Sequence, residues 1–511
     1  MTTTKWGFAL LAATAMTTMV SAPLHAQTAE ATASPEEAAA QLEFLKAQVD
    51  ALQAQLDAVK KSAGINTPSW SGGMPQLSNS DGYKFKVSGE LQFDAGQVGN
   101  PGPNKIVTNN LGYNARSRRL LIGASGALPG DFSYNFQFNL AEGVVDYEDL
   151  IFEYAPHKTP FTFTVGYFYP FSSMENMMSN RFTSFTERAQ LNDATGNGRR
   201  LGLAATYADK AGDFRIQVGA FGEGINGNTA LTYTGTSTSV LNAPAGTVAT
   251  TTTVATNNNG LYDRTGYQFS ARTVYSPQIW GGQLHLGASA QYRRFRQDAQ
   301  GIQYRARPFT QTTDQRFVGT GNIASKGDQI YGIEAMFIEG PFHAAGEAQY
   351  VNVDGYRPGT VVVSPKVLSG TLYPQDAHFI TGYGEAGFWL TGETRGYKNG
   401  KVDRTKILNP VSAGGLGGVQ IVGRVDYLDL TDAVGNTAAN SLGLINGGKQ
   451  IGYLGAINYW PIDYVRFTAE YARAEVTGGS FAATVVPTST ANPSQRKYGT
   501  DTFLFRAQID F

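Results

Sequence analysis

Phe132-Ser-Tyr-Asn-Phe-Gln-Phe-Asn-Leu140 is the clearest structural pattern in the chain. From Phe132 to Leu140 every second residue is aromatic or aliphatic, and every residue between them is polar. Successive side chains of a β-strand point to opposite faces of a sheet. The segment therefore predicts a strand with one apolar face and one polar face.

The same two-residue period recurs from Tyr83 to the C-terminus, where no segment has a helical period. We therefore predict a strand in each such segment, with boundaries good to a few residues. The sixteen segments are about 83–93, 116–127, 132–140, 146–154, 161–167, 199–207, 213–221, 265–275, 283–295, 329–338, 342–351, 378–390, 418–429, 449–460, 464–475 and 500–511.

Short and long connections alternate between these segments. The short ones are 128–131, 155–160, 208–212, 276–282, 339–341 and 461–463, and the long ones are 94–115, 168–198, 222–264, 296–328, 352–377, 430–448 and 476–499. Outer-membrane barrels have short periplasmic turns and long extracellular loops in this way. One exception is 391–417, a long connection where the count expects a periplasmic turn, so it must be an elaborated turn.

An all-β fold follows, a sixteen-stranded antiparallel transmembrane β-barrel in contact with the lipid bilayer. In a bilayer every backbone N–H and C=O needs a partner, so strands span only as a closed sheet. A secreted β-sandwich or β-solenoid is the alternative. It would need a second apolar layer, whereas the polar faces here carry charged residues in nearly every segment.

The N-terminus predicts export to the bacterial outer membrane. Lys5 precedes an apolar run from Trp6 to Val20, and small residues follow as far as Ala26. These are the parts of a secretory signal peptide, which we assign to residues 1–26. A transmembrane anchor is the weaker alternative, because the run is short and broken by threonines.

Residues 27–64 combine an Ala/Glu-rich segment with a heptad pattern. The apolar positions are Leu42, Leu45, Val49, Leu52, Leu56 and Val59. This spacing predicts a short N-terminal coiled-coil helix that pairs only when the barrel already brings copies together. An amphipathic helix lying against another surface is the alternative. Residues 65–82, rich in Ser, Gly, Pro and Asn, are assigned as a linker, and 83–511 as the barrel.

Composition excludes several classes of protein. The 511 residues carry a net charge of −1, which argues against a nucleic-acid partner, and contain no cysteine. No nucleotide-binding loop or metal-ligand spacing occurs, so we expect no cofactor and no metal. An outer-membrane hydrolase would have to use one of His157, His285, His343 and His378, none of which has a serine or acidic partner by spacing.

Connection 168–198 is the candidate functional segment. Loops beyond roughly 12–15 residues usually carry function, so we expect it to fold into the pore and narrow it. In open water two charges 4 Å apart interact by only about 1 kcal/mol, so selectivity must arise at a constriction. The predicted basic side of the constriction is Arg181, Arg188, Arg199 and Arg200, with Glu175, Glu187 and Asp193 opposing or orienting them.

Strand alternation also predicts which basic residues face the lumen. They are Arg119, Arg215, Arg272, Arg293, Arg424, Arg466 and Arg506, with Arg200 on the same reasoning. Arginine suits bidentate contact with phosphate, sulfate or carboxylate. It equally suits ion pairs with the acidic residues expected on the same faces.

The chain resembles the phosphate-selective porin O/P family of trimeric, sixteen-stranded outer-membrane channels. The likeness covers almost all of 83–511. It rests on Arg118-Arg-Leu-Leu-Ile-Gly-Ala-Ser-Gly126, Gly130-Asp-Phe-Ser-Tyr134, Glu148-Asp-Leu-Ile-Phe-Glu-Tyr154, Phe182-Thr-Ser-Phe-Thr-Glu-Arg188, Gly198-Arg-Arg-Leu-Gly202, Leu390-Thr-Gly-Glu393, Tyr427-Leu-Asp-Leu430 and Phe505-Arg-Ala-Gln-Ile-Asp-Phe511.

The resemblance implies a homotrimer, an inward third extracellular loop at 168–198, and passage of small anions such as phosphate or polyphosphate. Phe511 resembles the C-terminal signal read by the outer-membrane assembly machinery. The loop departs from the phosphate-selective pattern because it contains no lysine, and Leu121 stands where a basic lumen residue is expected. A general or sugar-selective porin, or a tether to the cell wall through the heptad helix, therefore stays open as an alternative.

Overall fold

The computed structural model describes most of the chain from Ser69 to Phe511. The gaps are 72, 103–110, 144, 225–237, 240–264, 298–299, 357–360, 363–370, 372, 374 and 435–443, and before Ser69 only residues 43, 46–52 and 55 are described. Two units divide the chain, Met1–Ile65 and Asn66–Phe511. In the first, the described residues are helical, with Val49 and Leu52 exposed. The signal-peptide prediction and the other heptad positions lie outside the described residues.

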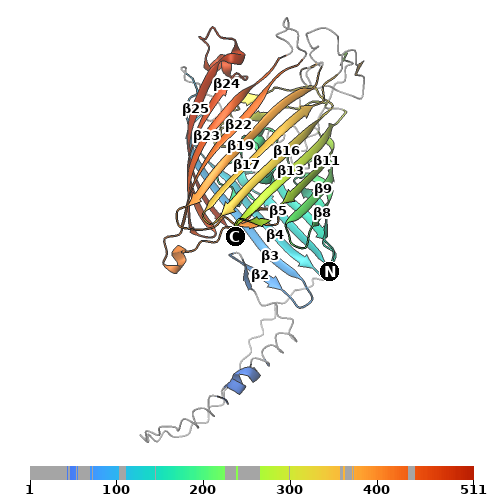
Figure 1. Cartoon of the computed structure of the whole chain (residues 1–511), viewed down its shortest axis with the longest axis vertical. Coiled ribbons are helices and arrows are strands. Elements are labelled where there is room, and N and C mark those ends of the chain that lie inside the picture. Colours follow the sequence, from blue (N-terminus) through green and yellow to red (C-terminus); the bar gives the residue numbers. More distant parts are fainter. Residues whose placement is uncertain are drawn as a thin grey trace, which may run out of the picture. The chain divides into compact units, whose positions relative to one another are not determined.

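Sixteen antiparallel strands of the second unit, within the part that the structure describes, close into a barrel (Figure 1). Each overlaps a predicted segment, which confirms the predicted fold. The strands are β3 (Lys84–Val98), β4 (Gly112–Leu128), β5 (Phe132–Asn139), β6 (Asp146–Tyr154), β7 (Phe161–Phe168), β8 (Arg200–Ala208), β9 (Phe214–Phe221), β11 (Thr265–Tyr275), β13 (Gly282–Phe295), β16 (Gly327–Glu339), β17 (Phe342–Val353), β19 (Ala377–Trp389), β22 (Gly418–Ala433), β23 (Leu444–Ile462), β24 (Val465–Thr477) and β25 (Lys497–Asp510). Closure comes from β25 pairing with β3, with Arg506 opposite Asp94.

Short helices and strands occur in addition to the sixteen barrel strands. Residues expected to form only a linker contain β1 (Ser69–Ser71) and β2 (Met74–Ser78), and β2 pairs with the start of β3. The linker prediction is therefore wrong for this hairpin, since these residues continue the sheet. The remaining elements are η1 (Ala141–Gly143), α2 (Met174–Met177), η2 (Asn180–Phe182), α3 (Gln190–Ala194), β10 (Thr238–Ser239), β12 (Gln278–Ile279), β14 (Arg305–Ala306), β15 (Val318–Gly319), β18 (Val361–Val362), β20 (Tyr397–Lys398), β21 (Lys401–Val402), η3 (Val411–Ala413), α4 (Ala482–Val485) and η5 (Pro493–Gln495).

The two faces of the wall differ as the alternation predicts. On β25, Phe503 and Phe505 are 58% and 49% exposed on the outside, whereas Arg506 on the lumen face is 0% exposed. Apolar outer side chains suit hydrocarbon, and polar inner ones suit a water-filled lumen. Among the helices of the described residues, none is long and apolar enough to cross a membrane.

A β-bulge in β4 interrupts this alternation. Gln92 of β3 lies opposite Arg119, but the next residue, Phe93, lies opposite Ser117, so Arg118 is the extra residue. A bulge leaves one residue unpaired and shifts the facing of the residues beyond it. Arg116 and Arg118 consequently line the same lumen cavity as Arg119.

Three connections fold into the barrel. The first, which we call the inner loop, joins β7 to β8 (residues 169–199) and carries α2, η2 and α3. A second inner loop joins β13 to β16 (296–326) and carries β14 and β15. The β19–β22 connection (390–417) carries β20 and β21, and these two strands pair as a hairpin that we call the inner hairpin. The long connection at 391–417 is thus an elaborated turn, as the strand count required.

Candidate functional site

Wall residues hold the inner loop mainly through its backbone. The Glu347 carboxylate on β17 accepts the N–H groups of Met174 and Glu175, at 2.7 and 2.9 Å. On β22 and β24, Asp426 and Glu470 accept the N–H groups of Gln190 (3.0 Å) and Thr186 (2.8 Å). We call β17, β19 and β22–β25 the docking wall, because these strands carry such acceptors or donors.

Donors on the docking wall bind carbonyl groups of the same loop. Arg466 donates to the Thr183 carbonyl at 2.6 Å, and Asn458 donates to that of Ser184 at 2.8 Å. Arg506 also donates to the Thr186 carbonyl. Because buried backbone groups need partners, these contacts fix where the loop crosses the lumen.

Most of the lumen arginines predicted from strand alternation are held in such contacts or in ion pairs. Arg424 is buried and bridges Glu175 and Glu385, at 2.6 Å each. The other ion pairs are Arg272 with Glu334 (2.5 Å), Arg293 with Asp328 (Nε to Oδ1 2.7 Å) and Arg506 with Asp94 (2.6 Å). The internal-pairing alternative therefore holds for these four. Arg215, by contrast, has no ion-pair partner among the described residues.

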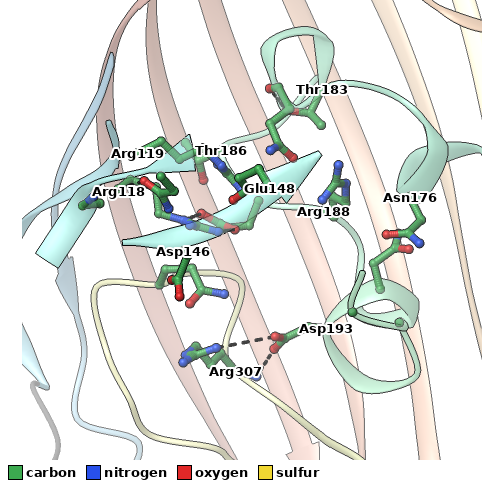
Figure 2. Close-up of a pocket in the computed structure, with 18 of the residues that line it drawn as sticks. Arg118, Arg119, Asp146, Glu148, Asn176, Thr183, Thr186, Arg188, Asp193 and Arg307 are labelled. Carbon is green, nitrogen blue, oxygen red and sulfur yellow. Dashed lines mark hydrogen bonds and ion pairs between the residues drawn. The ribbon is translucent and has the colours of Figure 1, made fainter. Parts of the chain in front are cut away.

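A cavity of about 500 Å³ lies beside the inner loop (Figure 2). It is bounded by β4, the start of β6, the inner loop and the second inner loop. Figure 2 shows Arg118 and Arg119 on one side and Arg188 and Asn176 on the other. Its charged lining residues are Arg116, Arg118, Arg119, Arg188, Arg199, Arg307 and Arg316 with Asp146, Glu148, Glu187, Asp193 and Asp314, and no lysine is among them.

Two of these arginines have no carboxylate partner among the described residues. Arg119 donates to the side-chain oxygen of Gln92 at 2.7 Å. Arg188 donates to the backbone carbonyls of Glu175 and Met178, at 2.8 and 3.0 Å. Carbonyl and amide oxygens orient a guanidinium without cancelling its charge. The cavity therefore presents two arginines that, in the described part of the chain, no acidic side chain contacts.

The four arginines predicted for the constriction separate into two groups. Arg188 and Arg199 line the cavity, and Arg199 stacks on the Tyr169 ring at 4.1 Å while pairing with Asp149 at 2.6 Å. Arg181 and Arg200 are not among the residues that line the cavity. Arg181 is drawn to Glu90 on β3 at 3.1 Å, and Arg200 is 3% exposed.

The three acidic residues expected to oppose or orient those arginines each form an ion pair with another arginine. Glu175 pairs with Arg424 on the docking wall, and only its backbone carbonyl meets Arg188. Asp193 instead binds the second inner loop, at 3.0 Å from Arg316 and 2.7 Å from the Arg307 N–H. Asp193 thus joins the two loops that narrow the lumen.

Glu187 is shared between the cavity and the docking wall. It lies 2.7 Å from Arg118 and 3.0 Å from Arg506. Burial alone would raise the pKa of the Glu187 carboxyl, but the charge and hydrogen bonds of Arg118, together with Arg506, hold that pKa well below its usual range. Glu187 is consequently ionised at neutral pH.

Sequence reasoning missed four cavity arginines: Arg116, Arg118, Arg307 and Arg316. Strict alternation places Arg116 and Arg118 on one face with Arg119 on the other, and only the bulge unites them. The second inner loop is anchored by Phe309, whose ring occupies the place where a Cβ on Gly452 would lie, 2.0 Å away. No local pattern predicts that packing, although the loop's length and four arginines could have drawn attention to it.

A closed barrel with an apolar outer face, a polar lumen and inward loops defines a membrane channel of the porin class. The model of the family "Phosphate-selective porin O and P" matches residues 85–491. An uncharacterized protein of Caulobacter vibrioides is 32% identical over 414 residues, which are 81% of this chain and 72% of that protein. The chain therefore belongs to the phosphate-selective porin O and P family, and it is an integral β-barrel of the outer membrane.

The similar solved structures have low sequence identity to this chain. The outer membrane channel DcaP of Acinetobacter baumannii is 11% identical, with a TM-score of 0.43 and coverage of 85% of this chain and 99% of that one. An anion-selective porin from Comamonas acidovorans is 10% identical, with a TM-score of 0.42 and coverage of 84% and 100%.

Proposed function

We propose that the barrel is a diffusion channel that prefers small anions, including phosphate, and that the preference arises in the cavity beside the inner loop. The observation that carries this proposal is the pair Arg119 and Arg188, which line the cavity without a carboxylate partner in the described part of the chain. An anion entering the cavity can bind their remaining N–H groups by charge-assisted hydrogen bonds.

The size of the electrostatic energies favours a preference for anions over strict anion selectivity. Coulomb's law gives about 1 kcal/mol for two charges 4 Å apart in bulk water and about 4 kcal/mol at the lower effective dielectric of a protein surface. The five acidic residues on the cavity offset most of the seven arginines. The cavity therefore favours anions without excluding cations.

Planar-bilayer reversal potentials in a potassium chloride gradient test the proposal. For Arg119→Gln combined with Arg188→Gln, we expect the chloride-to-potassium permeability ratio to fall by about five- to tenfold, as the loss of two nearby charges implies. Arg473→Gln is the matched control, because Arg473 lies on β24 beside Asp501, away from the cavity. An unchanged ratio in the double variant would refute the proposal.

A general porin is the second candidate, and the ion pairs favour it. Because Arg118, Arg199 and Arg316 each face a carboxylate, the cavity lacks the unneutralised basic cluster that strips water from phosphate. Titrating inorganic phosphate into a chloride current separates the two: block at micromolar phosphate indicates a phosphate-selective channel, and a linear current indicates a general porin that leans toward anions.

We propose further that the channel is a homotrimer, that Phe511 is read by the outer-membrane assembly machinery, and that the barrel has no catalytic activity. Family membership supports all three. Phe511 exchanges backbone hydrogen bonds with Gly89, at 3.0 and 3.1 Å, next to the seam where β25 meets β3. Cross-linking, deletion of Phe511 and a phospholipid-hydrolysis assay test them in turn.

Deleting residues 27–64 should leave conductance intact if that segment only tethers the barrel to the cell wall or aids the trimer.

A further inference from the structure

The cavity beside the inner loop also holds an acidic residue, Asp146, that forms no ion pair within the described part of the chain. Asp146 begins β6, is half-buried and lines the cavity together with Arg119 and Arg188. Figure 2 shows Asp146 on the side of Arg118 and Arg119, with Arg188 across from them. The cavity therefore combines a carboxylate that no basic side chain contacts with two arginines that no carboxylate contacts, all among the described residues.

A β-bulge in β6 directs the nearby Arg199 to the carboxylates that follow Asp146. The bulge places Glu148 and Asp149 opposite a single residue of β5. Both carboxylates form ion pairs with Arg199 of the inner loop, and the Asp149 contact measures 2.6 Å. A guanidinium held by two carboxylates stays with them, because each contact is a charge-assisted hydrogen bond. Asp146, two residues before the bulge, has no such contact and keeps its carboxylate available to a solute in the cavity.

The register of the sheet sets the separation between Asp146 and Arg119. Asp146 lies opposite Asn139 of β5, and Asn139 lies opposite Leu121 of β4. Arg119 is two residues from Leu121 and shares its face of β4. Neighbouring strands lie about 4.8 Å apart and each residue advances about 3.4 Å along a strand, so the Cα atoms of Asp146 and Arg119 are about 12 Å apart. Both side chains reach the same cavity from these positions.

Hydrogen bonds hold Arg119 away from Asp146. The Arg119 guanidinium donates to the side-chain oxygen of Gln92 on β3 at 2.7 Å, and Gln92 donates in turn to Gln508 on β25 at 3.0 Å. In the order of the strands, β3 lies on one side of β4, whereas β6 lies on the other side, beyond β5. Gln92 therefore draws the positive charge away from the carboxylate, and the two opposite charges stay separated across the cavity.

We propose that the cavity binds small zwitterionic solutes, with their carboxylate or phosphate group at Arg119 and Arg188 and their ammonium group at Asp146. An ion of one sign is attracted by one of these groups and repelled by the other, whereas a zwitterion whose ends are several atoms apart is attracted by both. A planar guanidinium suits the anionic end, and a single carboxylate suits a compact ammonium. The inference rests on the proposed function for the two arginines, and it adds Asp146 and the class of solute.

Block of the potassium chloride current by two solutes tests this proposal in planar bilayers at constant ionic strength. At neutral pH γ-aminobutyrate is a zwitterion, and butyrate has the same carbon chain without the ammonium group. For Asp146→Asn, we expect the half-blocking concentration of γ-aminobutyrate to rise by about three- to fivefold and that of butyrate to fall, because the first solute loses an attraction and the second loses a repulsion.

Two further variants control for effects other than the charge in the cavity. Asp501→Asn removes a carboxylate of β25 that pairs with Arg473 and does not line the cavity, so both half-blocking concentrations should stay at the wild-type values. Asp146→Glu keeps the charge and should keep the γ-aminobutyrate block. A γ-aminobutyrate block that is equal in the wild type and Asp146→Asn would overturn the proposal, and so would a shift of both solutes in the same direction.

The chloride-to-potassium permeability ratio of the same channels separates this inference from the proposed function. If the wild type prefers chloride and Asp146→Asn leaves the γ-aminobutyrate block unchanged, the zwitterion site is refuted while the anion preference stands. If the wild type shows no preference for chloride, the proposed function fails. The zwitterion site is then supported by a γ-aminobutyrate block that both Asp146→Asn and Arg119→Gln weaken, and it is refuted if either variant leaves that block unchanged.

Discussion

Arginines occur both on the docking wall and around the cavity, but they have different partners in the two regions. On the wall, the side chains of Arg424 and Arg506 are 1% and 0% exposed, and each is bound to carboxylates. At the cavity, Arg119 and Arg188 meet only amide or carbonyl oxygens and are among the residues that line it. The difference shows that partners and access, rather than residue type or strand face, decide which lumen arginines are available to a solute.

The physical cause is the inner loop itself. Where the loop covers the wall it excludes water, and a buried guanidinium is tolerated only when it is paired and hydrogen-bonded. Beside β4 and β6 the loop leaves the cavity open, and arginines that line it need no carboxylate partner when neutral oxygens hold them. One segment is therefore held by the docking wall on one side and lines the cavity on the other.

Removing a wall arginine should have the largest effect. Arg424→Gln leaves the buried carboxylates of Glu175 and Glu385 without their shared partner, and breaking such a pair costs about 3–5 kcal/mol. We expect the free energy of unfolding in guanidinium chloride to fall by this amount. Arg473→Gln, with exposed partners, should change it little, and equal stability of the two variants would contradict the division into wall and cavity.

The contacts of Asp193 with Arg307 and Arg316 join the two inner loops, and we call them the clasp. Breaking the clasp should change single-channel conductance more than stability. Asp193→Asn weakens the contacts to Arg307 and Arg316, so the second inner loop is freed to move away from the lumen axis. We expect single-channel conductance to rise by about twofold, since pore diameter governs flow. Asp314→Asn, which removes a more exposed cavity carboxylate, is the control, and a conductance equal to that of the control would count against the clasp.

Glu187 tests the boundary between the regions. Glu187→Gln removes one negative charge beside Arg118, so the chloride-to-potassium ratio should rise by about twofold. Because Arg118 and Arg506 hold the pKa of Glu187 well below its usual range, this carboxylate keeps its charge as the pH falls from 7 to 4. Reversal potentials of the wild type should therefore reveal no gain in anion preference from Glu187 between pH 7 and pH 4. If the anion preference did rise over this pH range and Glu187→Gln abolished the rise, Glu187 would be shown to titrate there.

Raising the salt concentration should produce the smallest change, a decline in anion preference that arises only in the cavity. The Debye length shortens from about 10 Å at 0.1 M to about 3 Å at 1 M, which screens exposed charges far more than buried pairs. The anion preference should decline modestly as the mean concentration of a fixed-ratio gradient increases, while unfolding stability stays nearly constant. A parallel loss of stability would mean that the wall contacts are also reached by solvent.

Much of the fold follows from local pattern, whereas the site depends on long-range contacts. Every barrel strand overlaps a segment with a two-residue period, because burial in lipid and exposure to water act on alternate residues. Arg118 could not be assigned, since a bulge of one residue has no signature in alternation. The pairing of Asp193 with the second inner loop joins positions more than a hundred residues apart, which no spacing rule reaches. For the inner hairpin, the sequence analysis predicts only an elaborated turn at 391–417, because the contacts that place this hairpin in the lumen, such as Tyr397 with His285, are long-range.

The docking wall grips the inner loop largely by its backbone, at the N–H groups of Met174, Thr186 and Gln190 and the carbonyls of Thr183 and Ser184. Backbone atoms are the same whatever side chain they carry. Side chains of the loop can therefore be substituted without displacing it, because the docking wall binds its backbone. Related channels could in this way acquire new solutes by altering a few loop residues while inheriting the barrel unchanged.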